Sequence, residues 1–140
     1  MVKLEIKQWT KELERPIYEL WKKENIYKFN KNTKKKIYSI DTPPPYINTP
    51  IHIGQATTYV LMDMFARFRR MIGQEVLFPL GLDKNGLPIE IATEKKFNIR
   101  LTETPREKFL ELCKKLLDEA GSATIDSFLR LGISFNSFEK

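Results

Sequence analysis

The middle of the chain alternates between short apolar runs and a long stretch with helical spacing. Residues 37–42 form a compact β-prone run, and residues 75–80 form a second one. Between them, residues 52–72 carry apolar side chains every three or four positions, which predicts an amphipathic helix ended by Gly73. A strand, a helix and a strand in that order predict a right-handed βαβ unit with parallel strands.

Helical spacing also occurs before this unit. Residues 7–25 have the pattern of an amphipathic helix that Pro16 interrupts, so we expect either two short helices or one that begins at Arg15. Its apolar stripe is expected to pack on the sheet and comprises Trp9, Leu13, Ile17, Leu20 and Trp21. In the helix at 52–72, the expected buried face comprises Tyr59, Met62, Phe65, Ala66 and Ile72.

The second half of the chain is predicted to be mainly helical, over residues 89–97 and 105–131. Thr104 is expected to cap the longer helix, with Pro105 in its first turn. Gly121 is expected to break or bend this helix. Cys113 lies on its apolar stripe and is expected to be a small core residue.

Each predicted strand leads into a helix through a tract rich in proline and glycine. Residues 42–55 have the sequence TPPPYINTPIHIGQ, and residues 81–90 have the sequence GLDKNGLPIE. Ligands of α/β proteins bind beyond the carboxyl ends of the strands. A helix that begins there offers unpaired N–H groups and the positive end of its dipole to a phosphate. The two junctions therefore predict a nucleotide site.

Four side chains or backbone positions at these junctions have suitable chemistry. His52, the only histidine of the chain, can donate an imidazole N–H to phosphate oxygens, and Gln55 on the same helix face can donate from its amide. Gly54 leaves room for a nucleotide against the backbone, although simple close packing would also require a glycine. Asp83 can bind an ammonium group, or it can merely cap the following helix.

Together, these tracts resemble the signature elements of class I aminoacyl-tRNA synthetases, in the branch that charges valine, isoleucine and leucine. Residues 52–55 are similar to the His-x-Gly-His signature, and residues 81–88 to the Gly-x-Asp-x-x-Gly-Leu-Pro element of that branch. The Thr-Pro-Pro-Pro entry and Asn85 favour the valyl enzymes. Residues 131–135 resemble the segment before the family's editing insertion. Gln55 and Thr49 depart from the histidine and glycine that are usual there.

The resemblance implies an α/β fold, namely the N-terminal half of a Rossmann-type parallel-sheet catalytic domain with flanking helices. It divides the chain into a helical extension at 1–36 and the first half of the nucleotide-binding domain at 37–140. The implied function is that of a valine–tRNA ligase, present as a fragment or as a split or truncated form. Such an enzyme uses ATP, which is expected to arrive with Mg²⁺, to activate valine and transfer it to tRNA(Val).

The resemblance also assigns roles to individual positions. Those implied in catalysis are His52 and Gln55. Those implied in ATP binding are His52, Gly54, Gln55 and Asn48. The amino-acid site is implied to comprise Pro44, Pro45, Tyr46 and Asp83. Asn85 and Gly86 are implied to contact the nucleotide or the tRNA end, and no metal-ligating set is expected in this chain.

Composition adds only broad limits to this interpretation. A hydrophobic content of 41% and a charged content of 30% are typical of a globular protein. The net charge of +6 is compatible with tRNA, but charge alone favours a lysine-rich solvated surface. One cysteine excludes an internal disulfide and suits the cytoplasm. Neither a membrane-length apolar run nor a signal-peptide pattern occurs.

Parts of a complete synthetase are missing from the sequence. It has no Lys-Met-Ser-Lys-Ser loop and no further strands to complete a doubly wound sheet. The remaining C-terminal part of a synthetase is therefore an expected partner, and the half-sheet is expected to expose an edge and apolar surface. The alternatives are an isoleucyl- or leucyl-type enzyme, a non-catalytic paralogue that binds tRNA or a partner chain, and a small-molecule nucleotidyltransferase, which the Gly-Leu-Pro-Ile-Glu continuation fits poorly.

Overall fold

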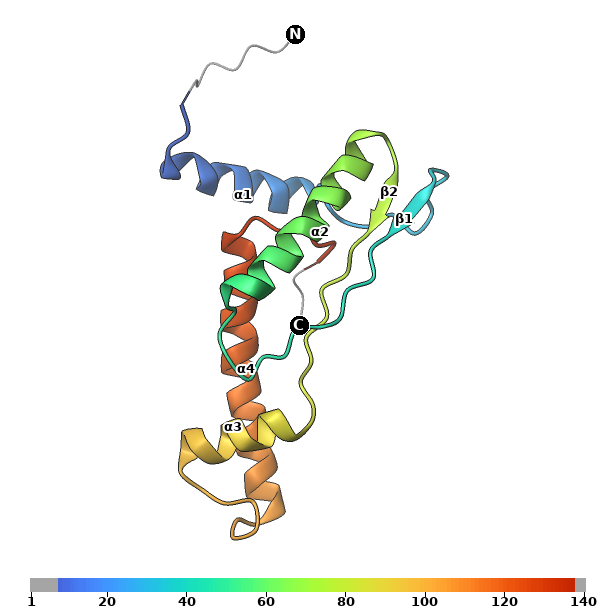
Figure 1. Cartoon of the computed structure of the whole chain (residues 1–140). Helices are drawn as coiled ribbons and strands as arrows, with labels where there is room; N and C mark the ends of the chain where they lie inside the picture. The colour runs from blue at the N-terminus through green and yellow to red at the C-terminus, as the bar shows by residue number, and fades with distance from the viewer. Residues whose placement is uncertain (1–7, 138–140) are drawn as a thin grey trace.

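The computed structural model describes residues 8–137 and contains a small parallel sheet with helices around it (Figure 1). A short 3-10 helix, Lys11–Leu13, comes first. The other elements follow in the order α1 Glu14–Glu24, β1 Ile37–Ser39, α2 Ile53–Met71, β2 Glu75–Leu77, α3 Leu87–Phe97 and α4 Arg106–Arg130. At one end of the molecule α3 packs against the first part of α4, and at the other end lie the sheet, α2 and α1 (Figure 1).

The sheet confirms the predicted strand–helix–strand unit. β1 and β2 pair in parallel, with Tyr38 opposite Val76. The regular strands are shorter than the apolar runs that predicted them. Beyond β1, the N–H of Ile40 still donates to the carbonyl of Leu77 at 2.9 Å. The ladder then ends, because the three prolines that follow have no N–H to donate.

α2 begins and ends close to its predicted limits. His52 is its N-cap, and Gly73 lies just beyond its end with a positive φ of 86°. At that φ the N–H of Gly73 bonds to the carbonyl of Arg70, and the next N–H bonds to that of Arg69. A glycine adopts this left-handed conformation without the clash that a Cβ would cause.

Two clusters of buried side chains hold the elements together. The larger lies between the sheet, α2 and the end of α4, and it comprises Ile40, Tyr59, Ala66, Val76, Phe78, Phe128, Ile133 and Phe135. The smaller joins the two junctions to α3 and α4 through Ile47, Ile89 and Leu116. The second cluster matters for function because it places the junction loops on a packed support.

Several predictions of burial were wrong. α1 contributes no buried residue, and Trp9 is 71% exposed, so the apolar stripe of the first helix does not pack on the sheet. On α2, Phe65 and Ile72 are exposed, whereas Ala56 and Asp63 are buried instead. A helix presents only one face to its support, and the sheet here is too small to cover more.

α4 also differs from its prediction at two points. Its N-cap is Pro105, without a side-chain hydrogen bond, so Thr104 is not the cap. The helix continues through Gly121 without a break, because this residue is buried where the helix crosses the junctions. A Cβ built there would lie 3.7 Å from side-chain atoms of Ile47 and Leu82. Cys113 is buried, as predicted.

The edge of β2 opposite β1 is partly covered by the segment after α4. The N–H of Asn136 donates to the carbonyl of Phe78 at 2.9 Å, and its side-chain amide donates to that of Val76 at 2.9 Å. The N–H of Phe78 donates to the side-chain oxygen of Asn136. This part of the expected open edge therefore has hydrogen-bond partners within the chain.

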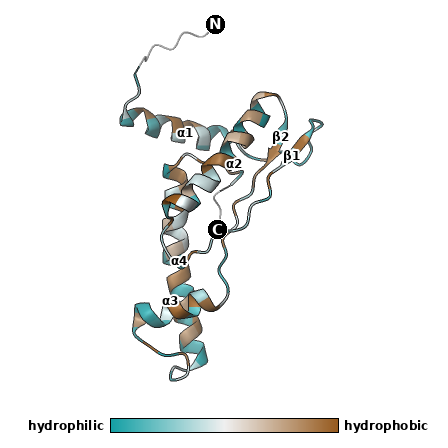
Figure 2. Ribbon diagram, viewed as in Figure 1, coloured by the Kyte–Doolittle hydropathy of each residue, from teal (hydrophilic) through white to brown (hydrophobic). Residues whose placement is uncertain are grey.

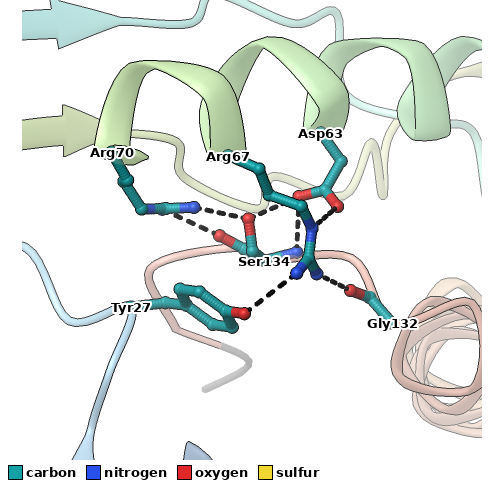
Figure 3. A network of polar contacts seen from close by, with 6 residues as sticks. All are labelled: Tyr27, Asp63, Arg67, Arg70, Gly132 and Ser134. Carbon is teal, nitrogen blue, oxygen red and sulfur yellow. Dashed lines mark hydrogen bonds and ion pairs between the residues drawn. The ribbon is translucent and has the colours of Figure 1, made fainter. Parts of the chain in front are cut away.

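A polar network fastens the same segment to α2 (Figure 3). The carboxylate of Asp63 accepts hydrogen bonds from the N–H of Ser134 at 2.8 Å, from its hydroxyl, and from Nε of Arg67 at 2.6 Å. Arg67 also donates to the Gly132 carbonyl and to the Tyr27 hydroxyl. Arg70 donates to the hydroxyl and the carbonyl of Ser134. We call this network, with residues 132–136 attached to it, the latch.

The charges in the latch depend on one another. Burial alone would lower the pKa of Arg67, but its hydrogen bond to Asp63 and the charge of that carboxylate raise this pKa above its usual value. For Arg70, burial is the larger influence and lowers the pKa. Asp63 is thus the only carboxylate in a network that holds two partly buried guanidinium groups.

Substituting this carboxylate should therefore be costly. Asp63→Ala would leave Nε of Arg67 and the N–H and hydroxyl of Ser134 without their shared acceptor, and it would remove a negative charge near Arg70. We expect the free energy of unfolding to fall by about 2–4 kcal/mol. Asp126→Ala is the matched control, because Asp126 pairs with Arg130 at 3.8 Å on the exposed side of α4. That change should cost less than about 1 kcal/mol. If urea unfolding shows that both variants lose the same free energy of unfolding, the stabilising role given to the latch is contradicted.

Candidate functional site

The two proline- and glycine-rich junctions lie side by side. Tyr46 and Asp83 form an isolated parallel bridge, in which the N–H of Asp83 donates to the carbonyl of Pro45 at 2.9 Å. Gly81 completes the contact, since a Cβ built on it would lie 3.4 Å from Cβ of Pro44. The structure therefore brings together four of the predicted amino-acid-site residues, Pro44, Pro45, Tyr46 and Asp83, at the ends of neighbouring parallel strands.

Burial fixes the backbone of this pair of junctions and leaves side chains accessible. Pro45 and Ile47 are buried, whereas Tyr46 between them is 52% exposed. Residues that alternate along an extended segment point to opposite sides. The turn is therefore anchored through Pro45 and Ile47 and leaves the side chain of Tyr46 at the surface.

His52 and Gln55 form a reciprocal cap at the start of α2. Nδ1 of His52 accepts the N–H of Gln55 at 3.4 Å, and the side-chain oxygen of Gln55 accepts the N–H of His52 at 3.3 Å. Because Nδ1 acts as the acceptor, the proton of the neutral imidazole is assigned to Nε2. The amide nitrogen of Gln55 is not used in the cap, so its two N–H donors stay available, as does Nε2–H of His52.

This cap gives a structural reason for Gln55, which departs from the histidine that is usual at this position. A capping box needs an acceptor at the N-cap and a Glu or Gln three residues later, and the pair His52 and Gln55 meets both requirements. The spacing was visible in the sequence, but the pattern was missed because His52 is not one of the usual capping residues.

Gly54 gives the His52 side chain room over the start of α2. A Cβ built on Gly54 would lie 3.2 Å from both Cε1 and Nδ1 of His52, closer than such contacts normally are. The glycine therefore lets the imidazole fold over the first turn of α2. The contact of Gly54 with a nucleotide stays a prediction.

Asp83 does not cap the helix that follows it. The N-cap of α3 is Gly86, which has a φ of 90° and so favours glycine. One carboxylate oxygen of Asp83 accepts the N–H of Asn85 at 3.0 Å and shapes the turn between them. The other oxygen forms no hydrogen bond within the described part of the chain and can accept one from a ligand.

The remaining predicted site residues are less constrained. Asn48 is half-buried, and Asn85 is exposed. Their proposed ligand contacts stay predictions, as does the convergence of His52 with Asp83. Sequence reasoning placed Tyr59 on the buried face of α2 but missed Asp63, although its i, i+4 spacing from Tyr59 could have identified it.

The main hollows of the surface lie elsewhere. One of about 490 Å³ is lined by residues such as Tyr27, Arg70 and Gln74, and one of about 960 Å³ by residues such as Trp21 and Leu129. Neither of these two hollows is lined by His52 or Asp83. Over residues 8–137 we find neither a cluster of metal-ligating side chains nor a helix long and apolar enough to cross a membrane.

Comparisons with known proteins agree with this geometry. A family model described as tRNA synthetases class I (I, L, M and V) matches residues 16–140. The solved ternary complex of LeuRS from Agrobacterium radiobacter K84 with tRNA and LeuAMS superposes with a TM-score of 0.73 at 24% identity. The match covers 88% of this chain and 14% of that one. The chain therefore belongs to the class I tRNA synthetase family, and its α/β fold is confirmed.

Within this family, curated relatives that match the chain include valine–tRNA ligases. That of Pyrobaculum aerophilum is 44% identical over 131 residues, which cover 92% of this chain and 16% of the relative. That of Methanocaldococcus jannaschii is 40% identical over 130 residues, or 93% of this chain and 15% of the relative. The chain thus spans only a small part of the length of the relatives that it matches.

Proposed function

We propose that this chain is the first half of the catalytic domain of a valine–tRNA ligase, which activates valine with ATP and transfers it to tRNA(Val). The observation that carries the proposal is the bridge between Tyr46 and Asp83, because it joins the two signature junctions into one surface. The identity to valine–tRNA ligases over nearly the whole chain supports valine as the substrate. Residues 1–36 would form a helical extension, and translation would place the protein in the cytoplasm.

The proposed activation step needs positioned groups and no protein nucleophile. An oxygen of the valine carboxylate attacks the α-phosphorus of ATP, the bond from that phosphorus to the bridging oxygen breaks, and pyrophosphate leaves with the bond electrons. Donors that are aimed at the phosphate oxygens stabilise the charge of the transition state. Nε2–H of His52 and the amide of Gln55 are the donors that the cap leaves available.

Valine would bind at the other half of the surface. The free carboxylate oxygen of Asp83 would accept a charge-assisted hydrogen bond from the α-ammonium group. Pro44, Pro45 and Tyr46 would line the side-chain pocket. Asn48 would contact the nucleotide, and Asn85 and Gly86 would contact the nucleotide or the tRNA end. Mg²⁺ would arrive with ATP, since it binds mainly through substrate phosphates and waters.

A long apolar face of α2 supports the proposal that further polypeptide completes the site. Its side chains recur at helical spacing, and Ile53 and Met71 at its two ends are 83% and 84% exposed. Between them lie the exposed residues Leu61, Met64 and Phe68. Hydrophobic residues along α2 are visible in Figure 2. A contiguous apolar face of this kind marks a contact surface, and we assign it to the remaining part of the synthetase.

The test uses a complemented enzyme, defined as this chain mixed with the remainder of the Pyrobaculum relative after removal of its 131 matched residues. ATP–pyrophosphate exchange should be faster with valine than with isoleucine by about 10- to 200-fold, because a pocket that fits valine has no room for one further methylene. The remainder alone is the control.

Faster exchange with isoleucine or leucine would instead identify one of the other enzymes of the branch. Exchange with none of them, combined with retained tRNA binding, would identify a non-catalytic paralogue. Gln55, which replaces the usual second histidine, is the feature that would fit such a paralogue.

A further inference from the structure

Tyr59 connects the buried core to the proposed valine pocket. It projects from the second turn of α2, is only 5% exposed, and donates its hydroxyl hydrogen to the Pro43 carbonyl at 2.6 Å. Pro43 opens the turn that continues through Pro44 and Pro45 to Tyr46. None of these prolines has a backbone N–H to donate, so the start of the turn needs a donor from elsewhere to bond to one of its carbonyl groups. The Tyr59 hydroxyl takes this role.

The ring of Tyr59 is itself held from two sides. It meets Phe128 of α4 edge-on at 4.8 Å between ring centres and Phe135 at 6.0 Å. Phe135 follows Ser134, the residue that Asp63 and Arg70 bind in the latch. Burial also raises the pKa of Tyr59 to about 12, so the phenol stays protonated and able to donate at neutral pH.

We propose that Tyr59 is a positioning residue for the amino acid, which holds the turn at 43–46 against Asp83 and so sets the width of the valine pocket. This inference rests on the proposed function. Pro43 is one end of the turn, and the bridge between Tyr46 and Asp83 is the other. With both ends tied, the Pro44 wall keeps a fixed distance from the carboxylate that binds the substrate ammonium. With the hydroxyl removed, only the bridge end remains tied.

Loss of the Tyr59 hydroxyl should weaken the binding of valine more than the binding of ATP. The donors proposed for ATP, His52 and Gln55, are held by their own reciprocal cap and do not bond to the turn at 43–46. Loss of the Tyr59 hydroxyl leaves that cap in place. A change in the turn should therefore weaken the binding of valine without weakening that of ATP. A general loss of stability would weaken both.

Tyr59→Phe in the complemented enzyme is the direct test. We expect the KM for valine to rise about five- to tenfold, as for the loss of one good hydrogen bond, with the KM for ATP changed less than about twofold. The valine-over-isoleucine ratio should fall as the pocket widens. Tyr18→Phe is the matched control, because the Tyr18 hydroxyl likewise donates to a carbonyl, that of Leu129, away from the junctions. It should leave both KM values unchanged.

A second measurement makes the inference testable without turnover. In the 140-residue chain labelled with ¹³C-carbonyl and ¹⁵N proline, only the Pro43–Pro44 and Pro44–Pro45 pairs give proline–proline signals. Tyr59→Phe should shift the Pro43 carbonyl signal and Tyr18→Phe should not. An unmoved signal, or equal rises of both KM values, would overturn the inference. A wild-type complemented enzyme without exchange activity, combined with a shifted signal, would instead contradict the proposed function.

Discussion

The 140-residue chain alone is expected to form valyl-adenylate at least about a thousandfold more slowly than the complemented enzyme, and to charge no tRNA at a useful rate. The donors at the start of α2 are neutral, and the sequence has no lysine loop to stabilise the charge that develops on pyrophosphate. Each donor removed from a closed site commonly costs about 3–4 kcal/mol of transition-state stabilisation. The loss of several donors therefore lowers the rate of adenylate formation by orders of magnitude. Single-turnover adenylate formation with labelled ATP measures the difference.

Recovery of activity should depend on the apolar face of α2. Met64→Glu places a charge at the centre of that face, where Met64 is 62% exposed, so the isolated chain should keep its stability while complementation weakens. Glu111→Gln, at an exposed position on α4, is the control and should complement normally. Full charging by the isolated chain would show that it already holds everything the reaction needs.

His52→Ala is expected to lower the exchange rate of the complemented enzyme by about 100- to 1000-fold, the usual loss for one donor to a developing charge. The same change also removes the N-cap of α2, which should cost about 1 kcal/mol of stability. The two effects therefore need to be separated before the loss of rate is assigned to catalysis.

His52→Ser separates them. A serine is a good N-cap, so α2 should keep most of its stability, but its short side chain cannot reach where the imidazole Nε2 does. We expect the serine variant to unfold at nearly the wild-type urea concentration and yet to be as slow in exchange as His52→Ala. Recovery of wild-type exchange with serine would show that His52 acts only as a cap.

The local sequence determined the elements and the two junctions. The spacing of apolar residues over 52–72 predicted a helix within one residue of its observed ends. The helical repeat is long enough there to be recognised without knowing what packs around it. The tracts at 42–55 and 81–90 likewise located the two junctions of the candidate site, since prolines and glycines restrict the backbone at those positions whatever packs around them. Gly86, with its φ of 90°, is an example.

What covers each helix was decided by the tertiary structure. The stripes on α1 and α2 have the same periodicity as the buried face of α4, yet many of their residues stay exposed because no other element of residues 8–137 covers them. Gly121 suggested a break by its helix propensity, but its contact with Ile47 and Leu82 makes it a crossing point inside α4. Propensity is a local quantity of about 1 kcal/mol, and burial of neighbouring side chains outweighs it.

The same division holds for the site. His52, Gln55 and Asp83 were identified from their types and positions at the ends of predicted strands. The bond from Tyr59 to Pro43, and the latch that joins Asp63 to Ser134, connect residues 16 and 71 positions apart. Such contacts follow from how α2, the turn and the end of α4 pack, and no single stretch of sequence contains that information. The sequence by itself determined which groups can act, and only the tertiary structure decided what holds them in place.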